Sequence, residues 1–210
     1  MIFDLFELLS SFVIDIISAA GYFGIFLTMT LESMAIPIPS EIIMPFSGFL
    51  AWEGRFNFFL VVFWGVAGNL TGSIILYLIG YYGGRRFLER YGRWFLISRH
   101  DLEIADRLFA KYGQGIIFFS RMLPVVRTYI SFPAGVGRMD FKKFSFYTFA
   151  GSIPWAILLT QIGALMGESW WKMETYFRKF DFVAAVLILI LAGWWVRRHL
   201  DLRKYELKQP

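Results

Sequence analysis

Arg121 and Arg127 stand on either side of Pro124 in the apolar stretch 116–137. A proline breaks a helix because it lacks the backbone N–H and clashes with the preceding turn. Around such a break, two guanidinium groups six positions apart can converge on one anion. A guanidinium group is planar, stays charged and binds phosphate through paired hydrogen bonds. Half-helix ends add N–H donors and positive dipole ends. The spacing therefore predicts a phosphate-bearing ligand with an apolar tail.

Three acidic residues also fall at the predicted membrane depth, namely Glu32, Glu41 and Glu53. Burial favours the protonated form of a carboxylate. Glu41 and Glu53 are therefore candidates for carrying a proton in a coupled transport cycle. Glu32 is a third candidate, and the alternative for it is an interfacial carboxylate at the outer end of the first span.

Each of these five charges needs a partner, a water-filled cavity or a ligand, because a charge at the bilayer centre costs roughly 2.5–3.5 kcal/mol on insertion scales. A binding site is the first interpretation. The alternative is that the glutamates and arginines only neutralise one another and hold two parts of the chain together.

The composition requires elements that face lipid rather than water. Of the 210 residues, 57% are hydrophobic and 18% are charged, whereas a soluble domain is about one quarter charged. A membrane span needs roughly 20 apolar residues. Four stretches fit full spans: 16–31, 56–84, 144–167 and 182–196. The predicted fold class is an all-α integral membrane protein, with interfacial helices beside these spans.

The segments 36–52 and 116–137 are apolar but interrupted by helix-breaking residues. A freed backbone group has no water partner in hydrocarbon, so we expect each segment to form a re-entrant hairpin buried against the spans. The residues that break the helices are Pro37, Pro39, Pro45 and Gly48 in the first hairpin and Pro124, Pro133 and Gly135 in the second.

The two hairpins resemble each other, and so do the spans that follow them. The spacing from Pro37 to Gly48 equals that from Pro124 to Gly135. Four positions of the following spans also align without a gap, namely Gly68, Asn69, Gly80 and Gly84 on Gly151, Ser152, Gly163 and Gly167. The alternative is a chance match between glycine-rich spans. Repeats with broken helices in matching positions indicate a transporter binding site, so we expect an inverted repeat.

Residues 1–210 are expected to form a single transmembrane domain. Residues 1–18 contain acidic but no basic residues, which favours an amphipathic interfacial helix over a cleaved signal peptide. Residues 85–111 are expected to form a cytoplasmic linker and residues 197–210 a cytoplasmic tail. Most Lys and Arg residues then share the side of the termini, and the positive-inside rule places this side in the cytoplasm.

Several other kinds of chemistry are not expected. The chain has no cysteine, and its two histidines stand in basic stretches, so neither a metal site nor a cofactor is predicted. No catalytic triad is visible, which argues against an enzyme. Orientation and anionic lipid explain the basic surplus, so nucleic acid is not an expected partner.

Two motifs resemble the signatures of the DedA family, the membrane proteins with the SNARE-associated or VTT domain. The first runs Glu32-Ser-Met-Ala-Ile-Pro-Ile-Pro-Ser-Glu41, and the second runs Phe119-Ser-Arg121-Met-Leu-Pro124-Val-Val-Arg127. The likeness covers about residues 21–167 and departs modestly at Ser152. It implies that the essential acidic pair of the family corresponds to Glu41 and Glu53, and the essential arginine pair to Arg121 and Arg127.

The resemblance also implies lipid translocation. The leading hypothesis is a flippase of the bacterial plasma membrane that returns undecaprenyl phosphate to the inner leaflet, coupled to protons. A flippase or scramblase for a phospholipid such as phosphatidylethanolamine is the nearest alternative. A small-ion or proton antiporter and an enzyme acting on lipid phosphate are more distant ones. The expected partners are a polyprenyl phosphate or phospholipid and protons, and a homo-oligomer is left open.

Overall fold

The computed structural model describes residues 2–36, 38, 40–91 and 115–167, which lie in one compact unit. Every element assigned in this part of the chain is a helix, which confirms the predicted all-α class. The helices are α1 (Ile2–Ala20), α2 (Tyr22–Ser33), α3 (Ser40–Trp52), α4 (Phe58–Tyr91), α6 (Ile116–Ser120), α7 (Pro124–Tyr129), α8 (Ser131–Val136) and α9 (Phe141–Met166).

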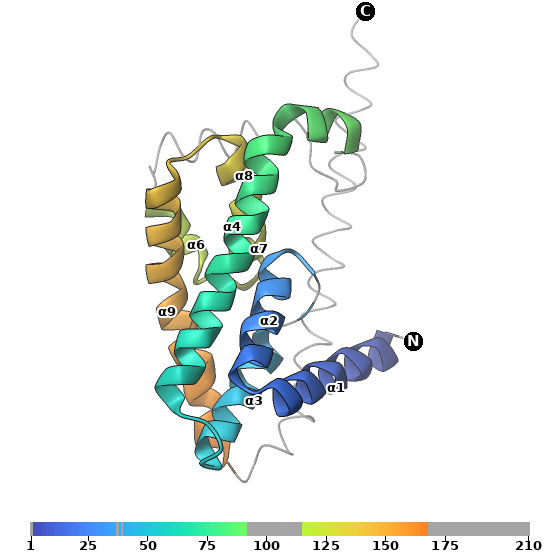
Figure 1. The fold of residues 1–210 in the computed structure, drawn as a ribbon, viewed down its shortest axis with the longest axis vertical. Helices are drawn as coiled ribbons and strands as arrows, with labels where there is room; N and C mark the ends of the chain where they lie inside the picture. The colour runs from blue at the N-terminus through green and yellow to red at the C-terminus, as the bar shows by residue number, and fades with distance from the viewer. Residues whose placement is uncertain (1, 37, 39, 92–114, 168–210) are drawn as a thin grey trace, which may run out of the picture. The chain divides into compact units, whose positions relative to one another are not determined.

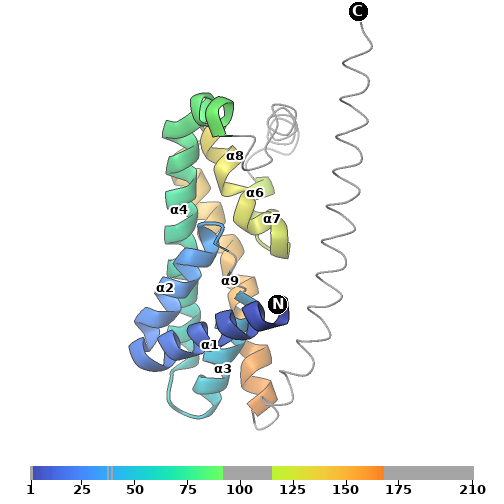
Figure 2. The ribbon, with the colours of Figure 1, turned by 90° about the vertical axis from the view of Figure 1, so that its right-hand side faces the viewer.

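The helices α4 and α9 are the longest of the apolar elements, and they pack against each other (Figures 1 and 2). Phe58–Gly83 within α4 and Phe141–Met166 in α9 are long and apolar enough to cross a membrane, judged by length and composition. Helices therefore stand where the spans 56–84 and 144–167 were predicted. α4 continues as a helix to Tyr91, so its last residues lie in the predicted linker 85–111.

The predicted full span 16–31 is wrong, because the chain changes direction at Gly21. This glycine has φ 62°, in the left-handed region that glycine adopts without a steric cost. α2 has only 12 residues, about 18 Å, which is too short to cross a hydrocarbon core of about 30 Å. α1 crosses close to the start of α2, since a Cβ added at Gly24 would lie 2.6 Å from the Ile16 carbonyl oxygen.

The first hairpin consists of α2 and α3, and its apex lies at residues 34–39. This corrects the predicted limits 36–52, because α3 is a single helix and Pro45 lies inside it without ending it. Ten residues of α3 are buried. They are covered by the neighbouring helices, chiefly α9, so the tertiary packing of α3 outweighs the helix-breaking tendency of its proline. Pro37 and Pro39 lie outside the described residues.

The second hairpin is broken into α6, α7 and α8, and Pro124 is the first residue of α7. Leu123 before it has an extended backbone (φ −103°, ψ 117°), the conformation that a following proline favours. The predicted break between the two arginines is confirmed. Pro133 lies within α8, which follows α7 after Ile130.

Close glycine contacts fasten each hairpin to a long helix. A Cβ added at Gly48 of α3 would lie 2.1 Å from the Thr160 carbonyl oxygen of α9, and one at Gly135 of α8 would lie 2.0 Å from the Tyr77 carbonyl oxygen of α4. Only glycine permits such close contact between helix backbones. Figures 1 and 2 show α2 and α3 along one half of α4 and α9, and α6, α7 and α8 along the other half.

A small apolar cluster holds the second hairpin against the long helices. Its buried members are Tyr77, Ile117, Ala134 and Phe144, one each from α4, α6, α8 and α9. The predicted span 182–196, the tail 197–210 and most of the linker 85–111 lie outside the described residues.

Candidate functional site

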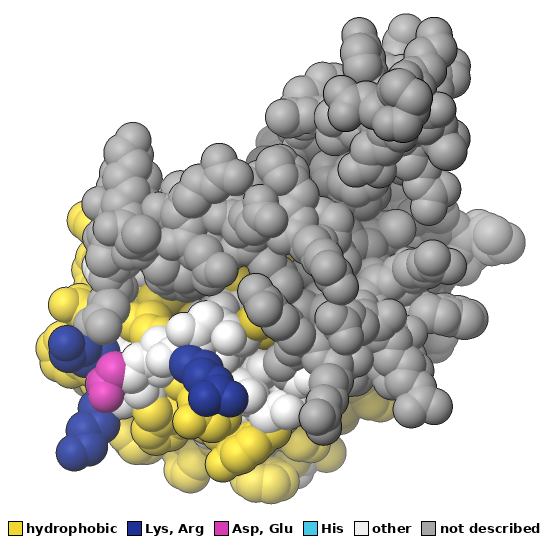
Figure 3. Space-filling model, turned by 90° about the horizontal axis from the view of Figure 1, so that it is seen from above, with side chains coloured by type: hydrophobic (Ala, Val, Ile, Leu, Met, Phe, Trp, Pro, Cys, Tyr) yellow, Lys and Arg dark blue, Asp and Glu magenta, His cyan; other side chains and the backbone are white. Residues whose placement is uncertain are grey.

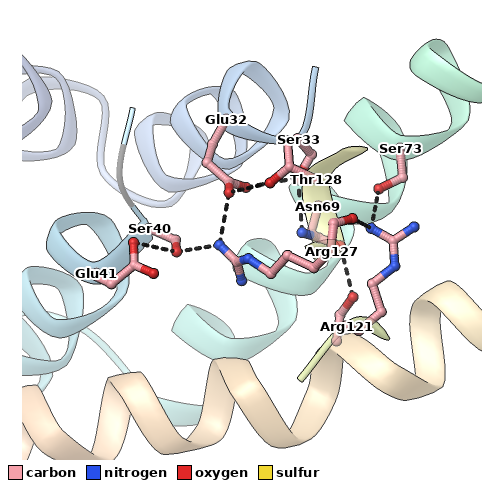
Figure 4. A network of polar contacts seen from close by, with 10 residues as sticks. Glu32, Ser33, Ser40, Glu41, Asn69, Ser73, Arg121, Arg127 and Thr128 are labelled. Carbon is pink, nitrogen blue, oxygen red and sulfur yellow. Dashed lines mark hydrogen bonds and ion pairs between the residues drawn. The ribbon is translucent and has the colours of Figure 1, made fainter. Parts of the chain in front are cut away.

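Arg127 joins the apexes of the two hairpins. Its side chain is 3% exposed and belongs to the last turn of α7. Its Nη2 donates hydrogen bonds to Glu32 Oε1 (2.8 Å) and to Ser40 Oγ. Glu32 lies near the end of α2 and Ser40 begins α3, so one guanidinium group contacts both arms of the first hairpin (Figure 4). Removing either partner of such a buried pair leaves an uncompensated charge.

Glu32 is held on both carboxylate oxygens. Ser33 Oγ donates to Oε2 (3.0 Å), and Thr128 Oγ1 of α7 donates to Oε1 (3.2 Å), which also accepts from Arg127. The side chain of Glu32 is 8% exposed. This burial argues against the alternative of a solvated interfacial carboxylate. The second polar contact with α7 makes the junction between the hairpins specific in geometry as well as in charge.

The other two acidic candidates have different surroundings. Glu41 is half-buried, and its Oε2 accepts a hydrogen bond from Ser40 Oγ (3.2 Å), the same hydroxyl that binds Arg127. Glu53 is exposed in the turn after α3. α3 is about 20 Å long, so Glu53 lies a helix length from the apex. The structure gathers Glu32 and Glu41 around Arg127, whereas the sequence resemblance pairs Glu41 with Glu53.

Arg121 is 1% exposed and is bound by oxygen atoms without a formal charge. Nη1 donates to Ser73 Oγ (3.0 Å) and to the Arg127 carbonyl oxygen (2.7 Å), and Nη2 donates to Ser131 Oγ (2.9 Å) and Thr148 Oγ1 (3.0 Å). These partners come from α4, α7, α8 and α9. Arg121 therefore braces the second hairpin, and among the described residues its guanidinium forms no ion pair.

A row of polar side chains extends the site between the long helices. Asn69 Nδ2 of α4 donates to Ser33 Oγ (2.8 Å), which in turn donates to Glu32. Ser152 Oγ of α9 donates to Asn69 Oδ1 (2.7 Å). The repeat alignment matches Asn69 with Ser152, and both residues are buried. The row links the ion pair at the apexes to the contact between the spans.

Sequence reasoning did not assign this polar row to the site. The available signal was the presence of polar residues in spans free of charge, since a buried polar group in hydrocarbon needs a partner. The residues that carried this signal are Asn69, Ser73, Thr148 and Ser152. Within the described ranges, no group of three or more His, Asp or Glu residues could hold a metal ion.

The bracing role of Arg121 leads to a prediction for stability. Arg121→Lys keeps the charge but cannot reach oxygens on four helices, so we expect a loss of about 1.5–3 kcal/mol, the range for a hydrogen bond to a charged group. Thermal unfolding of the purified protein in detergent measures this change. Arg138→Lys is the matched control, because Arg138 is exposed. Equal unfolding midpoints for the two variants would contradict the bracing role.

The geometry can be set beside known proteins. The VTT domain model matches residues 38–165. Undecaprenyl phosphate transporter A of Bacillus subtilis (strain 168) is 39% identical over 81% of this chain and 86% of its own length. Undecaprenyl phosphate transporter A of Staphylococcus aureus (strain NCTC 8325 / PS 47) is 30% identical over 90% of this chain and 96% of its own length. An alkaline phosphatase-like protein of Lactococcus lactis subsp. lactis (strain IL1403) is 30% identical over 85% of this chain and 86% of its own length.

No solved structure matches the chain. The domain match covers more than half of the residues and includes the whole of α3, α7, α8 and nearly all of α9. Ser40, Arg121 and Arg127 all fall within it. The chain belongs to the VTT-domain family, also described as the DedA family.

Proposed function

We propose that the protein is a flippase that returns undecaprenyl phosphate to the inner leaflet of the bacterial plasma membrane, linked to the proton motive force. The observation that carries this proposal is the buried Arg127–Glu32 pair at the meeting point of two hairpins. A permanent cation at this depth suits an anionic head group, while the tail remains in lipid. The names of the B. subtilis and S. aureus relatives favour the polyprenyl phosphate.

The proposed architecture is an inverted repeat with two re-entrant hairpins. Reciprocal contacts support it: α3 packs on α9 through Gly48 and Gly163, and α8 packs on α4 through Gly135 and Gly80. The sequence alignment matches the glycines of the first contact with those of the second. The hydrogen bond between the matched residues Asn69 and Ser152 joins α4 to α9. In an inverted repeat, such a contact lies near the pseudo-two-fold axis.

In the proposed mechanism, the Glu32 carboxylate is paired with the Arg127 guanidinium group when no lipid is bound. A proton on Glu32 weakens the ion pair, and the lipid phosphate replaces the carboxylate at the guanidinium. Release of the phosphate restores the pair and returns the proton. Glu41 is the second carboxylate of the cycle, reached through Ser40. Glu53 enters the proposal as an exposed carboxylate at the end of α3. Arg121 supports the phosphate site through its contact with the Arg127 carbonyl oxygen.

The proposed orientation places the α8–α9 connection in the cytoplasm. Figure 3 shows Lys and Arg side chains beside an acidic one at this end of the molecule. The exposed charged residues at this end are Arg138 and Asp140 of the connection and Lys142 and Lys143 of the first turn of α9. Their positive surplus supports the orientation.

The three carboxylates give the test of proton coupling. We expect Glu32→Gln and Glu41→Gln each to lower proton-driven transport of undecaprenyl phosphate in proteoliposomes at least tenfold. Glu53→Gln should lower it less, because Glu53 is exposed and away from Arg127. The measurement compares initial rates with and without an imposed pH gradient. Equal rates under both conditions in the wild-type protein would contradict proton coupling.

A phospholipid flippase is the alternative of the same class. A transport assay in which undecaprenyl phosphate and phosphatidylethanolamine compete separates the two functions. The name of the L. lactis relative favours a second class, a phosphatase acting on lipid phosphate. Release of inorganic phosphate from undecaprenyl phosphate by the purified protein would support that class. Cation flux that persists without any lipid phosphate would support an antiporter.

A further inference from the structure

Two buried N–H groups beside the ion pair have no hydrogen-bond partner in the described part of the chain. They are Arg127 Nε and Trp155 Nε1 of α9. A buried donor left unsatisfied costs about 1–3 kcal/mol. Native structures therefore seldom keep such a group without a ligand or another partner for it. Two such groups on neighbouring side chains indicate a position for an acceptor.

The two donors belong to side chains in contact. The Arg127 Cζ atom lies 5.4 Å from the centroid of the Trp155 ring, over its face. Trp155 lies three positions after Ser152 and seven after Thr148, so all three share one face of α9. Thr148 and Ser152 both take part in the polar contacts of the site. The Trp155 side of α9 therefore faces the site rather than an unrelated surface.

The chemistry of the occupant follows from which donors are already used. Arg127 Nη2 donates to Glu32 and Ser40, and Nε remains available. An indole N–H can only donate. The occupant must therefore offer acceptor oxygens, and the guanidinium next to it favours an anion. A phosphate oxygen meets both requirements.

We propose that Trp155 is a binding residue for the lipid phosphate, donating its indole N–H to the head group that Arg127 holds. This rests on the proposed function, in which a phosphate lipid enters the site. Arg127 Nε and Trp155 Nε1 bind two phosphate oxygens, and Arg127 Nη2 binds a third when Glu32 releases it. A phosphate monoester has three terminal oxygens, whereas the diester of a phospholipid has two. Trp155 thereby selects a monoester.

Binding of a short-chain monoester tests this assignment. Farnesyl phosphate and farnesol are titrated into the detergent-solubilised full chain by calorimetry. Wild type is expected to bind farnesyl phosphate more tightly than farnesol. Trp155→Phe keeps a ring over the guanidinium but removes the N–H, so it should weaken binding of farnesyl phosphate about tenfold and leave farnesol unchanged. For a phosphodiester of similar tail length, the same substitution should weaken binding less.

Trp64→Phe is the matched control, because Trp64 is a half-buried tryptophan of α4 whose ring packs against Phe26 and Phe63. It should bind farnesyl phosphate as wild type does. The proposal is overturned if Trp155→Phe binds farnesyl phosphate within twofold of wild type, or if wild type binds both compounds equally. Trp155→Phe could lose binding of farnesyl phosphate selectively while the wild-type protein moves no lipid in proteoliposomes. That result would overturn the proposed function and leave the phosphate site standing.

Discussion

Arg127→Gln is expected to abolish transport of undecaprenyl phosphate and to destabilise the protein by about 3–5 kcal/mol, the range for breaking a buried ion pair by removing one partner. The Glu32 carboxylate would stay buried and would keep only the neutral donors Ser33 and Thr128. Transport is measured in proteoliposomes, and stability by thermal unfolding in detergent. Arg127→Lys keeps the charge but not the fork geometry, so it should retain more stability than transport.

The double variant Glu32→Gln/Arg127→Gln separates the structural role of the pair from its role in binding. Neutralising both partners removes the uncompensated charge, so most of the lost stability should return. Transport should remain absent because the phosphate has lost its cation. A double variant that transports lipid at the wild-type rate would show that the pair only fastens the hairpins together. Wild-type stability in Arg127→Gln alone would show that no buried pair forms.

Gly163→Ala is expected to have the second largest effect, a loss of about 3 kcal/mol together with transport. The added Cβ would lie 1.9 Å from the Pro45 carbonyl oxygen and 2.6 Å from its carbonyl carbon. These are backbone atoms of α3, so a side-chain movement cannot relieve the overlap, and overpacking of this kind costs about 1–3 kcal/mol or more. α3 must move away from α9, and it carries Ser40 with it.

Gly115→Ala is the control for this prediction. A Cβ added at Gly115 meets nothing within 4 Å, and its φ of −62° suits alanine. Both variants introduce one methyl group, and only one of them introduces it between packed helices. The measurement is the unfolding midpoint in detergent and the yield of folded protein. Equal midpoints for the two variants would show that α3 and α9 do not pack as closely as described.

The sequence predicted the features that depend on composition and on local chemistry. Long charge-free stretches predicted α4 and α9, because a run of apolar residues of this length suits lipid. The break between the arginines was predictable because Pro124 fixes its own φ and restricts the residue before it. A proline predicts the end of a helix less well where tertiary contacts decide whether the helix continues. Pro45 lies inside α3, whose neighbours cover most of its length.

The features that sequence could not supply depend on which distant residues meet. Glu32 stands 95 positions before Arg127, and no local pattern distinguishes it from Glu41 or Glu53 as the partner. The change of direction at Gly21 was missed because the flanking residues are as apolar as those of a continuous span. The polar row through Asn69 and Ser152 needed the crossing of two long helices to become visible.

The crossed glycine contacts have a consequence for how the chain is made. α3 leaves the ribosome long before α9, the helix that receives its Gly48 surface. Until α9 is synthesised, this narrow backbone surface of α3 stays uncovered in the bilayer. α8 and α4 form the corresponding contact within a shorter stretch of chain. The contact between α8 and α4 can therefore form first, and α9 closes over the first hairpin when it arrives.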